Sequence, residues 1–256
     1  DELDCFELTP DKFKPMEQGL ELAIIDSLHK GCIQGAASPE SGIKTVEDLE
    51  GKKVAAAMGS IPQIQIASQM VLAGKVGKGL VGYIQSMGGK AIGLCGLDGA
   101  LFQAKKLDEK YGLVGKIVKV APQVVNDALS CGYIPVISTV ALGIDNDTAY
   151  NINADTAAAE LAISLGAEKL ILLTDVRGVL RDPKDDSTLI RQIRLEEVPS
   201  LLSSGVIGGG MIPKIQCCVN ALEHGVHRTH ILDGRIPHSI LTEMLSHQGI
   251  GTMLWE

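Results

Sequence analysis

The spacing of hydrophobic and polar residues changes near residue 71. Residues 1–70 are polar and irregular; only residues 16–30 place apolar side chains at helical spacing, and a short strand is expected at 53–57. From residue 71 onward, short aliphatic runs alternate with longer segments in which apolar residues recur at helical spacing. The later part of the chain therefore predicts alternating strands and helices, and the first part predicts little regular structure.

The alternating part of the chain predicts an α/β fold. We expect helices at 71–87, 122–129, 155–165, 213–223 and 237–246, and strands at 91–94, 101–105, 117–120, 134–138, 170–173, 229–232 and 252–254. Aliphatic strands that alternate with helices are typical of a mainly parallel sheet sandwiched between helices. Ligands of such sheets bind beyond the carboxyl ends of the strands, so the loops that leave those ends are the candidate functional segments.

Composition supports a folded core and argues against several classes of partner. Hydrophobic residues make up 45% of the 256 residues and aromatic residues only 3%, so aliphatic side chains must build the core. The formal net charge is −8 and lysine and arginine form no cluster, so no nucleic-acid partner is expected. No apolar run reaches the roughly 18 residues that a membrane span needs, so no membrane partner is expected either.

The cysteines and the first residues indicate a reducing compartment. The six cysteines form no Cys-x-x-Cys pair and two of them are adjacent, which suits neither a zinc site nor a disulfide framework. No resident metal is therefore expected. The chain opens on acidic residues, without the basic and apolar regions of a signal peptide. We expect a cytoplasmic protein, although one from the plastid stroma would show the same pattern.

The segment Tyr150-Asn-Ile-Asn-Ala-Asp155 stands immediately before an alanine-rich predicted helix. A single Asn or Asp at this place is most often a helix N-cap. Two amides and a carboxylate exceed what one cap requires, so we expect Asn151 to bind a substrate. An anion such as Asp155 is useful inside a phosphate site only when it holds cationic groups in position.

The segment Leu173-Thr-Asp-Val-Arg-Gly-Val-Leu180 leaves a predicted aliphatic strand. Asp175 can receive ligand hydroxyls or orient backbone amides, and Gly178 lets the chain pass close to a nucleotide. Thr-Asp-x-x-Gly is weak evidence by itself, because Asp and Gly are ordinary turn residues.

The segment Gly208-Gly-Gly-Met-Ile-Pro-Lys214 leads three glycines into a predicted helix with Pro213 near its first turn. Backbone N–H groups at such a helix start bind phosphate oxygens, and the helix N-terminus adds about half a positive charge. Lys214 opposes the helix dipole there. A lysine placed against this local preference favours a functional role, stabilising charge on a phosphoryl group during transfer, over a solvated surface lysine.

Together and in this order, the three segments resemble the acetylglutamate kinases of the amino-acid kinase family. The likeness continues in Leu72-Ala-Gly-Lys-Val76, Gly93-Leu-Cys-Gly-Leu-Asp-Gly99, Gly132-Tyr-Ile-Pro-Val136, His230-Ile-Leu-Asp-Gly-Arg-Ile-Pro-His238 and Gly249-Ile-Gly-Thr-Met253. The resemblance implies a three-layer sandwich around a mainly parallel sheet, as in carbamate kinases. It also implies an atypical N-terminal segment at 1–70 and a kinase domain at 71–256, with a nucleotide-binding lobe from about residue 150.

The resemblance implies transfer of the γ-phosphoryl group of ATP, accompanied by Mg²⁺, to the side-chain carboxylate of N-acetyl-L-glutamate in arginine biosynthesis. That carboxylate is already ionised at neutral pH, so positioning and charge neutralisation are the main requirements. By the same resemblance Lys214 and Asp155 are catalytic, and Asn151 and Gly59 bind the substrate. The residues implied for the nucleotide site are Thr174, Asp175, Gly178, Val179, Leu180, Gly209, Gly210 and Met211.

The N-terminal segment departs from the family pattern. Family members carry a Lys-x-Gly-Gly string after their first strand, and residues 1–70 contain none. Of the family's triple-glycine turn before Pro-Gln, only Gly59 remains, and the segment expected to hold a substrate arginine is missing before residue 71. Two interpretations stay open: a kinase impaired by these losses, and a non-catalytic nucleotide-binding or regulatory homologue. A third, another carboxylate or carbamate kinase on the same fold, is disfavoured by Gly-Gly-Met-Ile-Pro-Lys at 209–214 together with Asp-Gly-Arg-Ile-Pro-His at 233–238.

The resemblance also implies assembly and regulation. Members of the family suggest a homo-oligomer, either a dimer or a hexamer of dimers. Gly249-Ile-Gly-Thr-Met253 resembles the corresponding segment of the arginine-regulated members, so arginine feedback is a further expectation.

Overall fold

The computed structural model describes residues 5–7, 23–27, 34–37, 54–55, 73–146, 148–246 and 248–256. The helices are α3 (Gly77–Ser86), α4 (Gln123–Ser130), α5 (Ala154–Leu165), α6 (Val198–Ser203), α7 (Met211–Glu223) and α8 (Ser239–Leu245). Short 3-10 helices occur at Asp98–Ala100, Glu109–Tyr111, Asp186–Thr188 and Leu195–Glu197. The strands are β1 (Cys5–Glu7), β2 (Ala23–Ser27), β3 (Gln34–Ala37), β4 (Val54–Ala55), β5 (Ala91–Gly96), β6 (Phe102–Lys106), β7 (Gly115–Val120), β8 (Ile134–Gly143), β9 (Ala149–Asn151), β10 (Lys169–Thr174), β11 (Gln192–Arg194), β12 (Arg228–Asp233) and β13 (Thr252–Trp255).

The strands lie in three sheets of mixed direction, and the expected α/β class is confirmed. One sheet has the order β5-β8-β6-β7, with β9 paired to β8, and its β5–β8 and β6–β8 pairs are parallel. The C-terminal sheet has the order β10-β12-β13-β11, in which only β12–β13 is antiparallel. Strands β1 to β4 form the third sheet.

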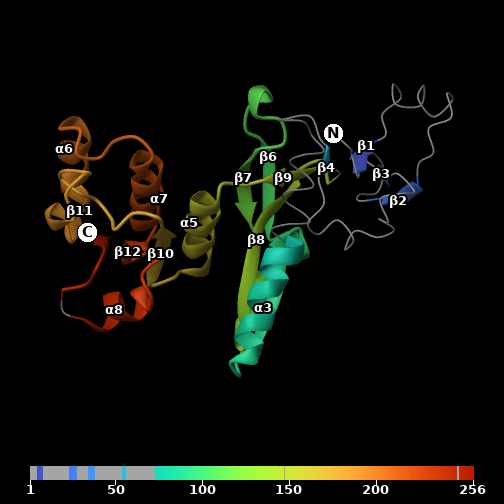
Figure 1. Ribbon diagram of the computed structural model, residues 1–256, viewed down its shortest axis with the longest axis horizontal. Helices are drawn as coiled ribbons and strands as arrows, with labels where there is room; N and C mark the ends of the chain where they lie inside the picture. The colour runs from blue at the N-terminus through green and yellow to red at the C-terminus, as the bar shows by residue number, and fades with distance from the viewer. Residues whose placement is uncertain are drawn as a thin grey trace.

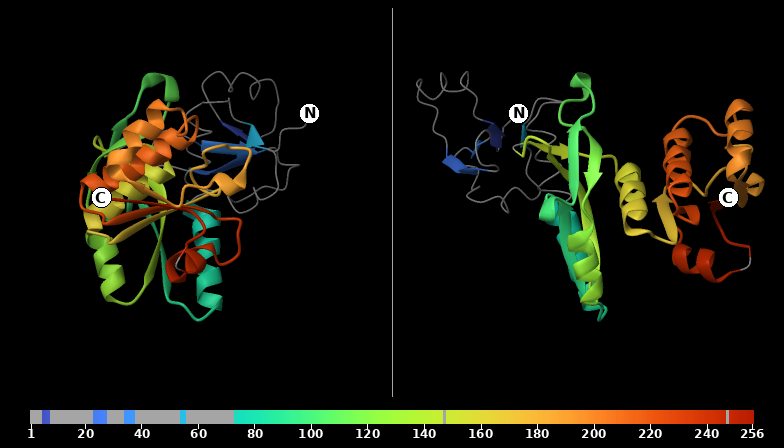
Figure 2. Two further views of the ribbon diagram at one scale, coloured as in Figure 1. Left: turned by 90° about the vertical axis from the view of Figure 1, so that its left-hand side faces the viewer. Right: turned by 180° about the vertical axis from the view of Figure 1, so that it is seen from behind.

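Helix α5 lies between the two sheets that follow residue 73. It contacts β7 of the first sheet and both β10 and α7 of the C-terminal part, and it separates the two in Figure 1 and in the right-hand view of Figure 2. Its alanines serve both cores: Ala157 belongs to the core around Phe102, and Ala159 and Ala162 belong to the C-terminal core. Small side chains let α5 approach both sheets closely, which explains the alanine-rich sequence.

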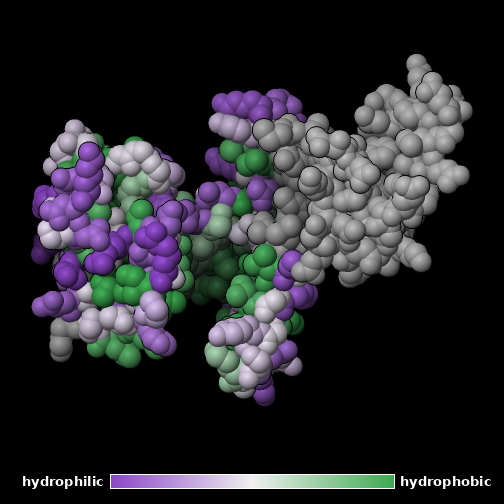
Figure 3. Space-filling model, in the orientation of Figure 1, coloured by the Kyte–Doolittle hydropathy of each residue, from purple (hydrophilic) through white to green (hydrophobic). Residues whose placement is uncertain are grey.

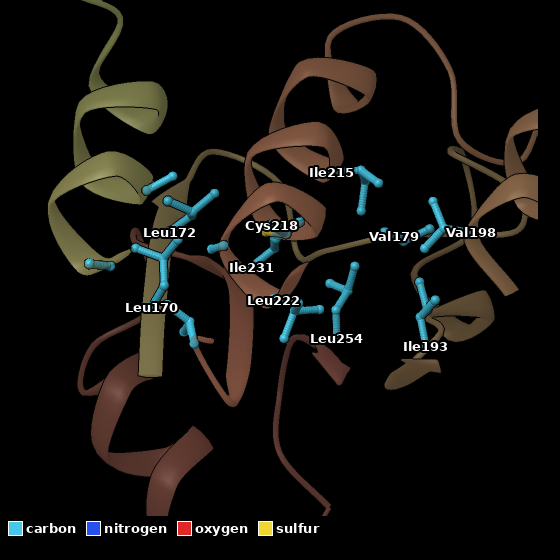
Figure 4. Packing of buried hydrophobic residues seen from close by; sticks show 14 of the residues in the cluster. Leu170, Leu172, Val179, Ile193, Val198, Ile215, Cys218, Leu222, Ile231 and Leu254 are labelled. Atoms are coloured by element: carbon cyan, nitrogen blue, oxygen red, sulfur yellow. The ribbon is translucent and has the colours of Figure 1, made fainter. Parts of the chain in front are cut away.

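The C-terminal core is built from aliphatic side chains on both strands and helices. Figure 4 shows Leu170 and Leu172 of β10 on one side, with Ile215, Cys218 and Leu222 of α7 packed over Ile231 and Leu254. The surface around α6 and α7 mixes hydrophilic and hydrophobic residues in Figure 3, whereas the buried face of α7 is apolar. The apolar stripe of α7 therefore fixes this helix, and with it the glycine-rich segment that precedes it.

Most predicted elements after residue 73 are present, with ends shifted by a few residues. The two short strands β9 and β11 and helix α6 were not predicted. The helix expected at residues 16–30 is wrong for residues 23–27, which form β2 and pair antiparallel with β3. Adjacent β-branched isoleucines in that segment favour a strand, and pairing with β3 outweighs the helical spacing.

Candidate active site

A pocket of about 400 Å³ lies beyond the carboxyl ends of the C-terminal strands. Strands β10 and β12 are parallel and end together, because Thr174 is paired with Asp233. The chain leaving β10 forms one wall of the pocket, and the segment before α7 forms the other. Its lining residues are Thr174, Asp175, Val176, Gly178, Val179, Leu180, Pro183, Gly205, Val206, Gly208, Gly210, Met211 and Lys214.

Lys214 forms an ion pair with Asp155 across two helices. Its Nζ donates to Asp155 Oδ2 at 2.8 Å, and the two side chains are 24% and 21% exposed. The pair arises because α5 and α7 pack side by side and place both residues in their first turns. Lys214 is the only cation among the described residues lining the pocket, so Asp155 directs the single positive side chain of this site.

The glycines before α7 leave backbone donors free beside the pocket, because the N–H groups of Gly209 and Gly210 have no hydrogen-bond partner among the described residues. Gly210 is the N-cap, and no side chain caps this end of the helix. An added Cβ on Gly209 or on Gly210 would meet nothing within 4 Å, so the backbone is open to a ligand. In the first turn of α7, Met211 and Ile212 donate to the carbonyls of Gly208 and Gly209, at 3.1 and 3.3 Å, and Pro213 has no N–H. The glycine N–H groups are therefore the donors that can bind an anion such as phosphate.

The two asparagines before α5 have different environments. Asn153 is the helix N-cap, and its Oδ1 accepts from the backbone N–H of Thr156 at 3.1 Å. Asn151 ends β9, and its Oδ1 is buried without a hydrogen-bond partner among the described residues. Buried polar atoms are normally paired, so this oxygen can accept a hydrogen bond that the described residues do not supply. It does not line the 400 Å³ pocket.

The loop after β10, residues 174–180, passes close to β13. Gly178 has φ +145°, and an added Cβ would lie 2.5 Å from Thr252 Oγ1, so only glycine fits. Val179 is 1% exposed, and its side chain belongs to the C-terminal core. The loop thus has a buried anchor at Val179, whereas Asp175 is exposed at the pocket.

The turn after β12 supports this loop from the side. Gly234 N–H donates to the Thr174 carbonyl at 2.8 Å. The Arg235 guanidinium donates twice to the Asp233 carboxylate, at 2.9 Å each, and lowers the pKa of Asp233 to about 2. Asp233 is therefore ionised at neutral pH and keeps the turn closed.

Most of the expected nucleotide-site residues lie around the pocket. Gly209 is absent from the lining, although Gly208 and Gly210 on either side of it are present. Gly59 lies outside the described residues. Pro183, Gly205 and Val206 were not predicted, because they reach the pocket from segments without a recognised motif. Pro199, in the first turn of α6, is the sequence signal that could have found this helix. Recognising α6 would have placed Gly205 and Val206 just after its end.

The described part of the chain shows neither a metal-binding cluster nor a membrane-spanning helix. Within it, no group of three or more His, Cys, Asp or Glu side chains could bind a metal ion. No helix built from the described residues is long and apolar enough to cross a membrane.

A lysine directed by a carboxylate, beside unpaired glycine N–H groups in a glycine-lined pocket, meets the requirements of a phosphoryl-transfer protein. The amino acid kinase family model matches residues 23–233, and the chain belongs to this family.

Individual relatives agree with this assignment. The chain is 59% identical over 189 residues to acetylglutamate kinase of Clostridium beijerinckii, covering 73% of this chain and 66% of that protein. It is 54% identical over 198 residues to acetylglutamate kinase of Heliobacterium modesticaldum, covering 73% and 67%. The match thus spans about two thirds of the length of these kinases.

A solved structure supports the fold. N-acetylglutamate synthase from Neisseria gonorrhoeae, complexed with coenzyme A and N-acetyl-glutamate, is 26% identical with a TM-score of 0.65. The match covers 81% of this chain and 48% of that one.

Proposed function

We propose that this protein works in the cytoplasm as a kinase that transfers the γ-phosphoryl group of ATP to the side-chain carboxylate of N-acetyl-L-glutamate, in arginine biosynthesis. The observation that carries the proposal is the Lys214–Asp155 pair at the nucleotide-sized pocket. The substrate is inferred from the name shared by the relatives at 54–59% identity.

In the proposed reaction, a carboxylate oxygen of the substrate attacks the γ-phosphorus, and the bond to the bridging oxygen of ADP breaks. The leaving electrons stay on ADP, and no proton is transferred, because the attacking carboxylate is already ionised. Lys214 Nζ neutralises charge on the transferred group, and Asp155 holds Nζ in its direction. The N–H groups of Gly209 and Gly210, just before α7, bind phosphate oxygens.

The nucleotide is proposed to occupy the pocket between the loop after β10 and the start of α7. Its walls would be Thr174, Asp175, Gly178, Val179, Leu180, Gly210 and Met211, with Gly209 adjoining. Asp175 is the only carboxylate among the described lining residues, which does not make a resident metal site. Mg²⁺ therefore belongs to the substrate, as the ion that accompanies the phosphates of ATP.

We propose that Asn151 binds N-acetylglutamate, and its unpaired buried Oδ1 supports that role. Gly59 is assigned to the substrate by resemblance. We further propose a nucleotide-binding lobe that begins at about residue 150, because the pocket is lined only by residues 174–214 among those described.

The test is an ATP-dependent hydroxamate assay, in which hydroxylamine traps the acyl phosphate formed from N-acetylglutamate. We expect hydroxamate that requires ATP, and much less with glutamate as acceptor. A soluble, folded protein that forms none above background would refute the proposal. Calorimetry then separates the alternative: ATP binding without turnover would identify a non-catalytic nucleotide-binding homologue, and weak turnover would identify an impaired kinase.

We also propose arginine feedback on a homo-oligomer. A second pocket of about 230 Å³ lies beside Gly249 and carries both signs of charge, as a zwitterionic amino acid requires, from Glu243, Arg191, Arg228 and Lys169. Arginine is expected to inhibit the hydroxamate reaction, and sedimentation is expected to give at least a dimer. Full activity in excess arginine would refute the proposed feedback. A monomer at assay concentration would refute the proposed oligomer.

A further inference from the structure

We infer that the side-chain hydroxyl of Thr252 positions the loop of residues 174–180 for ATP. Thr252 does not line the pocket, so its role is that of a positioning residue. The inference rests on the proposed function, because that function makes this loop the wall of the nucleotide site.

The Thr252 hydroxyl both accepts and donates a hydrogen bond, each with a different segment of the chain. Thr252 begins β13 and is 0% exposed. Its Oγ1 accepts from the Val179 N–H at 2.8 Å and donates to the Ile190 carbonyl at 2.7 Å. Ile190 N–H in turn donates to the Val179 carbonyl at 2.9 Å. These contacts close a ring of hydrogen bonds through three separate segments of the chain.

The hydroxyl also fits the shape of the loop. Gly178 leaves the space that Thr252 Oγ1 occupies, because a Cβ there would lie at 2.5 Å. Val179 follows at once, with its side chain directed into the C-terminal core, where Figure 4 shows it near Val198. The loop is thereby fixed at one residue from two sides, by an apolar side chain and by a buried backbone hydrogen bond.

The outer part of the same loop has weaker restraints. Thr174 Oγ1 donates to Asp175 at 3.2 Å, which is a contact between neighbours in the chain. The Arg177–Asp186 ion pair, at 3.0 Å, joins side chains that are 48% and 63% exposed. Exposed ion pairs contribute little to holding a loop. The Val179–Thr252 bond is buried, and losing the hydroxyl would leave the buried Val179 N–H and the partly buried Ile190 carbonyl without this partner.

Three variants separate the hydroxyl from the shape of residue 252. Thr252→Val keeps the branched shape and removes the hydroxyl, and Thr252→Ser keeps the hydroxyl and removes the methyl group. Thr229→Val is the matched control: Thr229 is also 0% exposed, lies on the neighbouring β12, and its hydroxyl makes no hydrogen bond to the loop. Each folded protein is titrated with ATP by calorimetry, and the KM values for both substrates are measured.

We expect Thr252→Val to raise the Kd and the KM for ATP about tenfold, with the KM for N-acetylglutamate within about twofold of wild type. Thr252→Ser and Thr229→Val are expected to bind ATP like wild type. Thr252→Val with wild-type ATP affinity would overturn the inference while the proposed function stands. Wild-type protein that binds ATP without turnover would overturn the proposed function alone. Absence of ATP binding by wild type would overturn both.

If Thr252→Val does not fold, hydrogen exchange on the wild-type protein tests whether Thr252 holds the loop at Val179. The Val179 amide is expected to exchange as slowly as the amides of β12 and to slow further with ATP. Exchange as fast as that of exposed loop amides would overturn the inference.

Discussion

Replacing Lys214 with alanine is expected to lower the rate of phosphoryl transfer by about 10²–10³-fold, or about 2.7–4 kcal/mol of transition-state stabilisation. Lys214 is the only cation lining the described pocket, and its Nζ is held at 2.8 Å from Asp155. No other described residue that lines the pocket can replace that charge. The variant also leaves the partly buried Asp155 carboxylate facing the phosphates, which adds repulsion to the lost attraction. The measurement is the hydroxamate rate at saturating ATP and N-acetylglutamate.

The matched control for this prediction is Lys116→Ala. Lys116 is an exposed lysine on β7, outside the pocket, and its loss changes the net charge by the same amount. We expect the control to keep the wild-type rate. A Lys214→Ala protein that retains more than half of the wild-type rate would contradict the catalytic role given to this lysine.

Replacing Glu243 with alanine is expected to lower the free energy of unfolding by about 3 kcal/mol. Glu243 Oε1 is 2.9 Å from His230 Nδ1, and both side chains are 5% exposed. Its Oε2 accepts from the backbone N–H groups of Ile250 and Gly251, at 2.7 and 3.0 Å. Alanine would leave these donors buried without a partner. Urea unfolding at pH 7 measures the loss, with Glu223→Ala, an exposed change at the end of α7, expected within about 0.5 kcal/mol of wild type.

The same carboxylate makes stability depend on pH. Burial by itself would raise the pKa of Glu243, but the hydrogen bonds from His230, Ile250 and Gly251 outweigh burial and lower it. The unfolded chain therefore binds this proton more readily than the folded one. The contribution of Glu243 is complete above its unfolded pKa of about 4.3 and disappears as pH falls through the lower folded value. A stability difference between wild type and Glu243→Ala that grows with acidification would contradict this assignment.

The spacing of apolar residues predicts an element when that element has a regular apolar face of its own. Helix α7 was expected because its apolar stripe is regular, and Ile215 and Leu222 of that stripe are buried. Strands β9 and β11 were missed because three residues carry no readable period, and each is defined by its partner, β8 or β13. The segment 23–27 shows the opposite error, in which helical spacing was present but strand pairing prevailed.

The residues of the candidate site were likewise predictable only where a local sequence pattern marks them. The loop after β10 and the glycines before α7 were predicted because each follows or precedes a recognisable element. The Lys214–Asp155 contact followed from the resemblance and from no local pattern, since the residues are 59 positions apart. Thr252 could not be predicted, because its hydrogen bond to Val179 joins positions 73 residues apart and no motif marks a buried hydroxyl.

The most direct test of the account is a structure of the full chain with a non-hydrolysable ATP analogue. We predict that the nucleotide fills the pocket between residues 174–180 and the start of α7, with its terminal phosphate about 3 Å from Lys214 Nζ. A nucleotide bound elsewhere, or one whose terminal phosphate lies out of reach of Lys214, would contradict it.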